Sequence, residues 1–328
     1  MPSPLLEVDG LSVTFRTRHS DVFAVRDVSM HLNQGETLAV LGESGSGKSV
    51  TAMSMMGLLD RSRAQTRGQI RYAGTDLLTM PPAGWREYRG ERIAMIFQDA
   101  VAALNPVMTV GGQISEVIRA HKQADRPGAK RRAIEMMERV NIPSAAERFD
   151  SHPHEFSGGM RQRIMIAMAL ALDPAVLIAD EPTTALDVTV QAQIMQLLKD
   201  LQAENGMALL LITHDIGVSV QMADRIAVMY AGRVVETGTA AEVYANPKHP
   251  YTIGLLESMP SAHLKGQRLA AIPGNPPPLN EVTPGCAFGP RCKFAIERCT
   301  SEMPALRTIT NDQLAACHRS EEMAHVVC

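Results

Sequence analysis

The stretch that decides the fold of this 328-residue chain reads Gly42-Glu43-Ser44-Gly45-Ser46-Gly47-Lys48-Ser49. It has the form G-x-x-x-x-G-K-S, which is a phosphate-binding loop when a strand precedes it and a helix follows it. An apolar run at 37–41 predicts the strand, and a helical run from Ser49 to Met56 predicts the helix. The alternative is an ordinary glycine-rich turn between a strand and a helix.

The residue types of this loop explain how it would hold a nucleoside triphosphate. Glycines let the backbone curl until successive N–H groups point at phosphate oxygens, and the helix that starts here adds the positive end of its dipole. Lys48 is expected to reach the β- and γ-phosphates, and the Ser49 hydroxyl to ligate Mg²⁺. The residues expected to bind the nucleotide here are Gly42, Ser44, Gly45, Gly47, Lys48 and Ser49.

Composition and charge argue against several classes of protein. Hydrophobic residues make up 45% of the chain, enough for a substantial core, and the net charge of −3 argues against a nucleic-acid partner. No apolar stretch reaches the ~18 residues that a membrane-spanning helix needs. Residues 1–4 lack the basic and apolar pattern of a signal peptide. We expect a cytosolic protein whose membrane association is made through a partner.

The other apolar runs predict an α/β fold. Short runs predict a small antiparallel sheet, with strands at 11–15, 23–25 and 68–72. In this sheet Phe15 would either stack on adenine or fill the core. Apolar runs predict buried strands at 92–97, 175–179 and 208–212, and further strands are predicted at 226–230 and 233–236, in a mostly parallel sheet with an added antiparallel part. Helical spacing at 110–140, and in the helix that ends at Leu172, predicts a helical insertion.

Polar residues follow three of the predicted buried strands. Asp180 is placed to ligate Mg²⁺, and Glu181 to orient the attacking water or accept a proton from it. Gln98 and His214, each at a strand end, are candidates to sense the γ-phosphate. The alternative for 180–181 is an exposed acidic pair with no catalytic role.

A second anion-binding element lies at Ser157-Gly158-Gly159, where a strongly apolar helix begins. One compact ATPase site does not need two such elements, but two chains packed head to tail do. The serine and glycine N–H groups of one chain would then close over the γ-phosphate held by the other. The sequence therefore predicts composite sites in a dimer.

Taken together, these motifs resemble the ATP-binding subunit of an ABC transporter, over residues 5 to 255. The resemblance implies a P-loop ABC-type ATPase that hydrolyses ATP with Mg²⁺. It implies that Glu181 is the catalytic base, that His214 is the switch histidine, and that Gln98 contacts Mg²⁺ and couples to a permease. It also implies that Asp187, in the run Ala185-Leu186-Asp187, lies on the loop across the dimer interface.

Four further stretches resemble the dipeptide and oligopeptide importers within this family: 96–99, 104–106, 152–163 and 246–252. The same subfamily includes nickel and opine importers, which stay open as alternatives. A non-transport ABC ATPase and an iron–sulfur regulator are the less favoured hypotheses. Met160 stands where the signature usually ends in glutamine, and Ala100 where proline is usual. We expect neither to abolish activity, because neither side chain is needed to contact phosphate.

The resemblance also implies partners and a location. It implies that ATP hydrolysis powers import of di- and oligopeptides across the cytoplasmic membrane. The expected partners are two transmembrane permease subunits, an extracytoplasmic solute-binding protein and a second ABC ATPase. A heterodimer is expected over a homodimer, because the family often pairs two related ATPases. The chain would then sit peripherally on the cytoplasmic face of the inner membrane.

A change of composition after residue 255 predicts a domain boundary. We expect a nucleotide-binding domain at 1–255, whose helical subdomain covers about 100–170, and a C-terminal extension at 256–328. The proline-rich segment 272–278 reads as a linker inside this extension.

The extension holds all five cysteines of the chain, four of them spaced C-x5-C-x6-C-x17-C at Cys286, Cys292, Cys299 and Cys317. Four thiolates can hold zinc or an iron–sulfur cluster, and this spacing lacks the paired C-x-x-C of zinc ribbons. The resemblance favours a [4Fe–4S] cluster, because peptide-importer ATPases with this tail carry one. Zinc and unliganded cysteines are the alternatives. A cluster would staple a tail that has little apolar content of its own.

Overall fold

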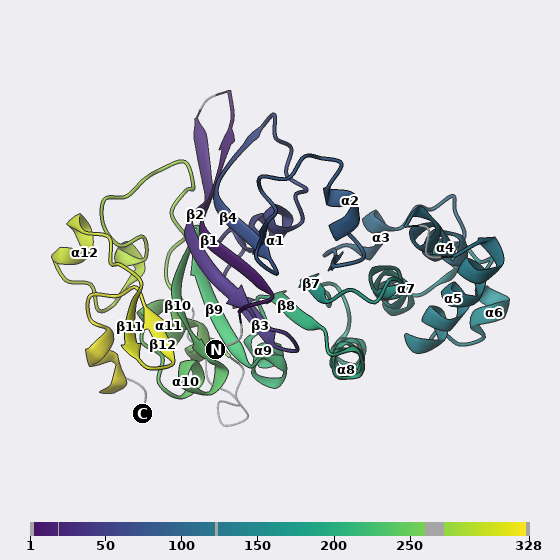
Figure 1. The fold of residues 1–328 in the computed structure, drawn as a ribbon. Helices are drawn as coiled ribbons and strands as arrows, with labels where there is room; N and C mark the ends of the chain where they lie inside the picture. The colour runs from purple at the N-terminus through teal and green to yellow at the C-terminus, as the bar shows by residue number, and fades with distance from the viewer. Residues whose placement is uncertain (1–2, 19, 122–123, 260–271, 326–328) are drawn as a thin grey trace. The chain divides into compact units, whose positions relative to one another are not determined.

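The computed structural model describes residues 3–18, 20–121, 124–259 and 272–325 (Figure 1). The chain divides into two compact units, which are described separately below. The first unit comprises Met1–Leu32, Glu36–Leu78 and Thr213–Cys328, and the second comprises Asn33–Gly35 and Thr79–Ile212. In Figure 1 the second unit is blue to green, while the first takes its colours from both ends of the bar.

The first unit contains an antiparallel sheet in the strand order β2-β1-β4-β5. Its strands are β1 (Leu6–Arg16), β2 (Asp21–Leu32), β4 (Ala64–Tyr72) and β5 (Thr75–Asp76). On β1 the buried side chains include Leu6, Val8, Leu11 and Val13. A bulge between Val8 and Leu11 keeps these residues on one face of the strand, as expected for a sheet that buries only one side. The antiparallel sheet predicted from the short apolar runs is confirmed.

A second set of strands in the first unit has the order β11-β12-β10-β9-β3. It consists of β3 (Thr37–Leu41), β9 (Arg225–Tyr230), β10 (Arg233–Thr239), β11 (Arg307–Thr310) and β12 (Gln313–Ala315). The pair β3 and β9 is parallel, and the other pairs are antiparallel. Strands β11 and β12 come from the C-terminal extension and were not predicted from the sequence.

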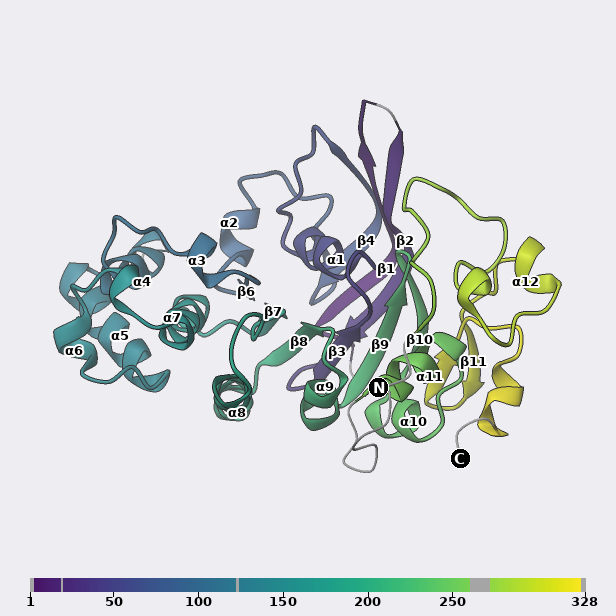
Figure 2. The ribbon, with the colours of Figure 1, turned by 180° about the vertical axis from the view of Figure 1, so that it is seen from behind.

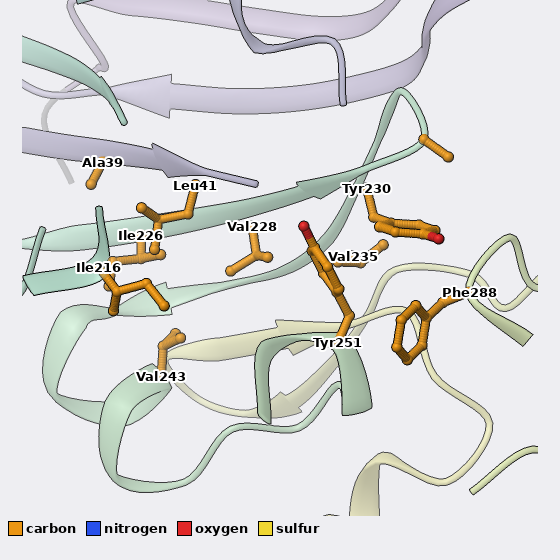
Figure 3. Packing of buried hydrophobic residues seen from close by; sticks show 11 residues of the cluster. Ala39, Leu41, Ile216, Ile226, Val228, Tyr230, Val235, Val243, Tyr251 and Phe288 are labelled. Atoms are coloured by element: carbon orange, nitrogen blue, oxygen red, sulfur yellow. The ribbon is translucent and has the colours of Figure 1, made fainter. Parts of the chain in front are cut away.

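The helices of the first unit include α1 (Lys48–Met55), α9 (Ile216–Met222), α10 (Ala240–Ala245), α11 (Pro250–Glu257) and α12 (Arg298–Ser301). Short 3₁₀ turns at Gly289–Arg291 and Ser320–His325 complete them. Figure 2 shows α10 and α11 beside the strands of the extension. An apolar cluster built on β3 and β9 takes in Tyr230, Tyr251 and Phe288, whose rings lie 4.6–5.4 Å apart (Figure 3). Phe288 therefore fastens the extension to this core.

The second unit contains three parallel strands in the order β8-β7-β6. They are β6 (Ile93–Ile96), β7 (Val176–Asp180) and β8 (Ala208–Thr213), and every residue in them is buried. Strands covered on both faces read as continuous apolar runs, which is why the sequence identified all three. The predicted parallel strands are confirmed.

Most helices of the second unit lie in the region predicted to be helical, about 100–170, and two lie outside it. They are α2 (Trp85–Tyr88), α3 (Ala100–Ala103), α4 (Val110–Ala120), α5 (Arg126–Arg139), α6 (Ala145–Arg148), α7 (Gly158–Leu170) and α8 (Val188–Asn205). The helical spacing predicted at 110–140 belongs to two helices, because Asp125 caps a new one by accepting from the Gly128 N–H at 2.8 Å. Both ribbon views show α4, α5 and α6 grouped together. Among the described residues, no helix is both long enough and apolar enough to cross a membrane.

Candidate nucleotide-binding site

The phosphate-binding loop, residues 42–49, connects β3 to α1 in the first unit. Its backbone is possible only with glycine at two places. A Cβ on Gly42 (φ 153°) would lie 2.2 Å from the Met229 carbonyl oxygen, and a Cβ on Gly47 (φ 102°) would lie 2.5 Å from the Ala24 carbonyl oxygen. Gly47 is also the residue from which α1 starts, and the first turn of α1 carries no acidic side chain. A helix start free of negative charge suits an anion.

Lys48 lies over this loop with a buried side chain. Its Nζ donates to the carbonyl oxygens of Gly42 at 2.8 Å and Glu43 at 3.0 Å. Ser49 is half-buried in the first helical turn, while Ser44 and Gly45 are exposed. The loop thus presents an ammonium group, backbone N–H groups and a hydroxyl, which is the donor set that fits a triphosphate with its metal ion.

Glu43 ties the same loop to the far end of the chain. Its N–H donates to the Tyr251 hydroxyl at 2.8 Å, and its carboxylate accepts two bonds from the Arg291 guanidinium at 2.7 and 3.0 Å. Burial raises the pKa of the Tyr251 hydroxyl. The contact between Glu43 and Arg291 was not predicted, because these residues are separated by 248 positions. The only signal was that Tyr251 belongs to one of the family-like stretches.

Two other predicted nucleotide contacts lie in the first unit. Phe15 is half-buried on β1, where it pairs with Val22 on one side and Ala64 on the other. His214 is exposed and directly follows β8, and its neighbour Asp215 caps α9 by accepting from the Val218 N–H at 3.2 Å. Their roles as adenine and γ-phosphate contacts stay predictions.

Gln98 and Glu181 are brought together in the second unit. Gln98 Nε2 donates to a Glu181 carboxylate oxygen at 2.9 Å, and the Thr184 hydroxyl donates to the same oxygen at 2.9 Å. Glu181 has φ 46°, in the left-handed region that a non-glycine residue enters only when its surroundings hold it there. Asp180, which ends β7, is buried with 5% exposure. Two donors therefore orient the Glu181 carboxylate, which was predicted to be the catalytic base.

Ser157, Gly158 and Gly159 start α7, and their surroundings link them to Asp187. Ser157 caps the helix by accepting from the Met160 N–H at 3.3 Å. A Cβ on Gly159 would lie 2.6 Å from Cγ1 of Val190, in the first turn of α8. Asp187 caps that helix by accepting from the Val190 N–H at 3.0 Å. The structure thus places two predicted interface elements side by side, with Ser157 and Gly158 exposed.

The prediction of an iron–sulfur cluster is wrong. The described residues contain no group of three or more His, Cys, Asp or Glu side chains that could hold a metal ion. The four cysteines line a cavity of about 10 Å³, which has room for one water molecule. Burial raises the pKa of the Cys286 and Cys292 thiols, and raises that of Cys317 to about 11. The zinc alternative lacks support on the same grounds, and Cys328 lies outside the described residues.

The extension does not need a metal staple, because protein contacts hold it. Phe288 is 4% exposed within the aromatic cluster, and β12 pairs with β10. The tail also has more buried apolar side chains than predicted. Phe288, Ala315, Ala316 and Met323 are all buried.

Comparison with known families gives two matches. The family described as "ABC transporter" matches residues 25–184. The family described as "Oligopeptide/dipeptide transporter, C-terminal region" matches residues 235–299. Together they confirm the resemblance that the motifs indicated.

Curated relatives match nearly the whole chain. A peptide import ATP-binding protein of Brucella abortus is 47% identical over 334 residues, covering 98% of each chain. A second from the same species is 50% identical over 315 residues, covering 96% of this chain and 95% of its own. An oligopeptide transport ATP-binding protein of Haemophilus influenzae is 48% identical over 320 residues, covering 98% of each chain.

Solved structures agree with the fold. A dimeric ATP-binding cassette bound to ADP and Pi has a TM-score of 0.64 and 26% identity, covering 72% of this chain and 98% of its own. A component of an ABC transporter complex from Clostridium perfringens has a TM-score of 0.63 and 27% identity, covering 77% of this chain and 96% of its own. The predicted fold class, with its parallel strands, antiparallel sheet and helical region, is confirmed.

Proposed function

This chain belongs to the ATP-binding proteins of ABC transporters, and we propose that its ATP hydrolysis powers the import of di- and oligopeptides. The observation that carries the choice of cargo is the match of residues 235–299 to the C-terminal region of oligopeptide and dipeptide transporters. Relatives named for peptide import, at 47–50% identity over nearly the full chain, support it. No described feature favours nickel or opines over peptides.

In this proposal the phosphate-binding loop holds the triphosphate of ATP, with Lys48 on its β- and γ-phosphates. Ser49, Gln98 and Asp180 are the proposed protein partners of Mg²⁺, which supplies charge neutralisation on the phosphates. Glu181 acts as the general base, and its orientation by Gln98 and Thr184, each at 2.9 Å, supports that role. His214 is proposed to contact the γ-phosphate, and Phe15 to stack on adenine.

A second ATPase chain is proposed to complete each ATP site. Ser157, Gly158 and Gly159 of one chain would meet the nucleotide held by the other, with Asp187 beside them. The exposure of Ser157 and Gly158 supports this role, because exposed N–H and hydroxyl groups at a helix start can reach a ligand held by another chain. A similar cassette is dimeric with ADP and Pi bound. We propose a related but different ATPase as the partner.

The proposed membrane partner is a pair of permease subunits, served by an extracytoplasmic solute-binding protein. Three apolar side chains near Gln98 are exposed although they are large: Phe97 (42%), Val101 (63%) and Val107 (80%). Apolar side chains left open in one short segment suit a protein interface. In this arrangement the chain lies peripherally on the cytoplasmic face of the inner membrane.

Reconstitution tests the proposed function. The chain would be purified with its permease subunits and second ATPase, placed in vesicles, and supplied with the solute-binding protein. We expect ATP-dependent uptake of a labelled dipeptide and no uptake of labelled nickel. Uptake of nickel without peptide would overturn the choice of cargo. Failure to co-purify with any permease would overturn the transport function itself.

A further inference from the structure

One arginine of the C-terminal extension, here residues 272–325, contacts the phosphate-binding loop directly. Arg291 and Glu43 form a two-point ion pair with N–O distances of 2.7 and 3.0 Å. The exposed fractions of the two side chains are 6% for Arg291 and 27% for Glu43. A pair this well shielded is screened much less by solvent and salt than an ordinary surface pair.

The rest of the Arg291 side chain is fixed as well. Its Nε donates to the Pro273 carbonyl at 2.9 Å, and its Nη1 also donates to the Tyr230 hydroxyl at 3.2 Å. Its guanidinium lies 5.7 Å from the Tyr230 ring centre and 5.9 Å from that of Phe288. The bonds to Glu43 raise the pKa of the guanidinium further, so it stays charged. The extension therefore places a permanently charged guanidinium next to the Glu43 carboxylate.

A second chain of hydrogen bonds leads from the extension to the backbone N–H of Glu43, through the Tyr251 hydroxyl. Buried Glu236 accepts from the N–H groups of Lys248 and His249 at 2.6 and 2.9 Å, and from Gln313 Nε2 of the extension at 2.7 Å. His249 Nδ1 accepts from the Tyr251 N–H at 3.0 Å. These bonds set the start of α11, from which Tyr251 reaches Glu43. Both routes lead from the extension to one residue of the loop.

We propose that Arg291 is a positioning residue for ATP binding, which acts by neutralising Glu43 inside the phosphate-binding loop. The C-terminal extension thereby sets the affinity of this chain for ATP. The inference rests on the proposal that the loop binds ATP. It adds that a segment outside the nucleotide-binding motifs controls that binding.

The physical reason is the sign of the charges. A carboxylate within a loop built for phosphate repels the triphosphate, and Arg291 cancels that repulsion. If the ion pair were only a tether, loss of either partner would loosen the loop and weaken binding alike. If Arg291 acts through charge, loss of the two partners has opposite effects. The two explanations therefore predict different signs.

The experiment compares Arg291→Gln, Glu43→Gln and the double variant in the full-length chain. ATP affinity would be measured by equilibrium titration with Mg²⁺, and the melting temperature would be recorded for each. We expect Arg291→Gln to weaken ATP binding about tenfold and Glu43→Gln to tighten it about threefold, with the double variant close to wild type. Equal weakening by both single variants, or a double variant no better than Arg291→Gln, would overturn the proposal.

Matched controls separate this result from others. Arg307→Gln breaks a comparable two-point pair with Glu321, at 2.5 and 2.8 Å, that lies within the extension. We expect it to leave ATP affinity unchanged, and an equal loss there would overturn the proposal. If Arg291→Gln does not fold, the sign of the Glu43→Gln effect decides alone. A wild-type chain that binds no ATP would instead refute the proposed function.

Discussion

The phosphate-binding loop and the Ser157-Gly158-Gly159 element both begin a helix and both suit an anion, yet they are held in different ways. The loop is fixed by residues from the far end of the chain, because Glu43 bonds to Tyr251 and Arg291. Ser157 is exposed, and its hydroxyl caps its own helix by accepting from the Met160 N–H. The loop is therefore supported by distant parts of its own chain, whereas the second element has a local cap and stays exposed.

This difference separates two kinds of variant. Changes to the loop or to its distant supports should alter ATP binding by a single chain. Changes at Ser157 should leave that binding intact and act only once a second chain is present. The following predictions test this division.

Lys48→Ala is expected to weaken ATP binding by about 100-fold or more. Charge-assisted hydrogen bonds contribute about 1.5–3 kcal/mol each, and this ammonium would make more than one to the phosphates. Equilibrium titration of the isolated chain measures the loss, and the melting curve should show that the fold survives. Lys293→Ala, which removes an exposed ammonium paired with Glu257, is the control. Near-normal binding by Lys48→Ala would refute the assigned role.

Glu181→Gln is expected to reduce ATP hydrolysis by a factor of about 10² to 10⁴, the usual contribution of a general base. ATP binding should persist, and a closed dimer with ATP should accumulate in gel filtration with the partner ATPase. Glu204→Gln, which removes a carboxylate paired with Arg139, is the control. Wild-type hydrolysis rates in Glu181→Gln would contradict the assignment.

The distant supports of the loop should make stability depend on pH. Burial raises the pKa of Glu236 to about 7 from 4.5. The folded chain then holds this proton more tightly than the unfolded chain, so the free energy of unfolding falls as pH rises from 4.5 to 7 and is level above 7. The fall should be about 3 kcal/mol, since each unit of pKa difference corresponds to about 1.4 kcal/mol.

Denaturant titrations at several pH values measure this slope, and Glu236→Gln should flatten it. Asp312→Asn serves as a control for a carboxylate of the same unit, and it should leave the slope as it is. An unchanged slope in Glu236→Gln would show that the carboxyl is not the source.

Ser157→Ala should have the smallest effect. We expect it to slow hydrolysis by the assembled pair of ATPases about tenfold, the equivalent of one charge-assisted hydrogen bond. ATP affinity of the single chain should not change. Thr239→Ala is the matched control, because Thr239 caps α10 in the same way, by accepting from the Glu242 N–H at 3.3 Å. Loss of ATP affinity in the isolated Ser157→Ala chain would break the distinction drawn above.

Local patterns predicted the parts of this molecule that local forces determine. The strand at 37–41 lies where its apolar run placed it, and the strand predicted at 175–179 lies within one residue of β7. Gln98 and Glu181 were predicted as site residues separately, because each follows a strand, and in the structure a hydrogen bond joins them. The division at residue 255 stays a prediction.

Contacts between distant segments could not be predicted from the sequence. Strands β11 and β12 are short and only partly apolar, so neither shows a clear alternation. Arg291 and Glu43 carry no shared motif, and only folding brings them together. The cysteine spacing, a local pattern, led to the wrong prediction of a cluster because the packing of the tail was not known. Four cysteines suggested a metal site, whereas burial raises the pKa of three of their thiols and β12 secures the tail.

The pairing of β12 with β10 also decides how the extension can be studied. Without β12, strand β10 would present an open edge along Glu236, Thr237 and Gly238. Open strand edges recruit other strands, which leads to aggregation. A chain shortened to its nucleotide-binding motifs is therefore expected to be insoluble. Single substitutions, and not deletion, are the tools that can reveal what this segment does.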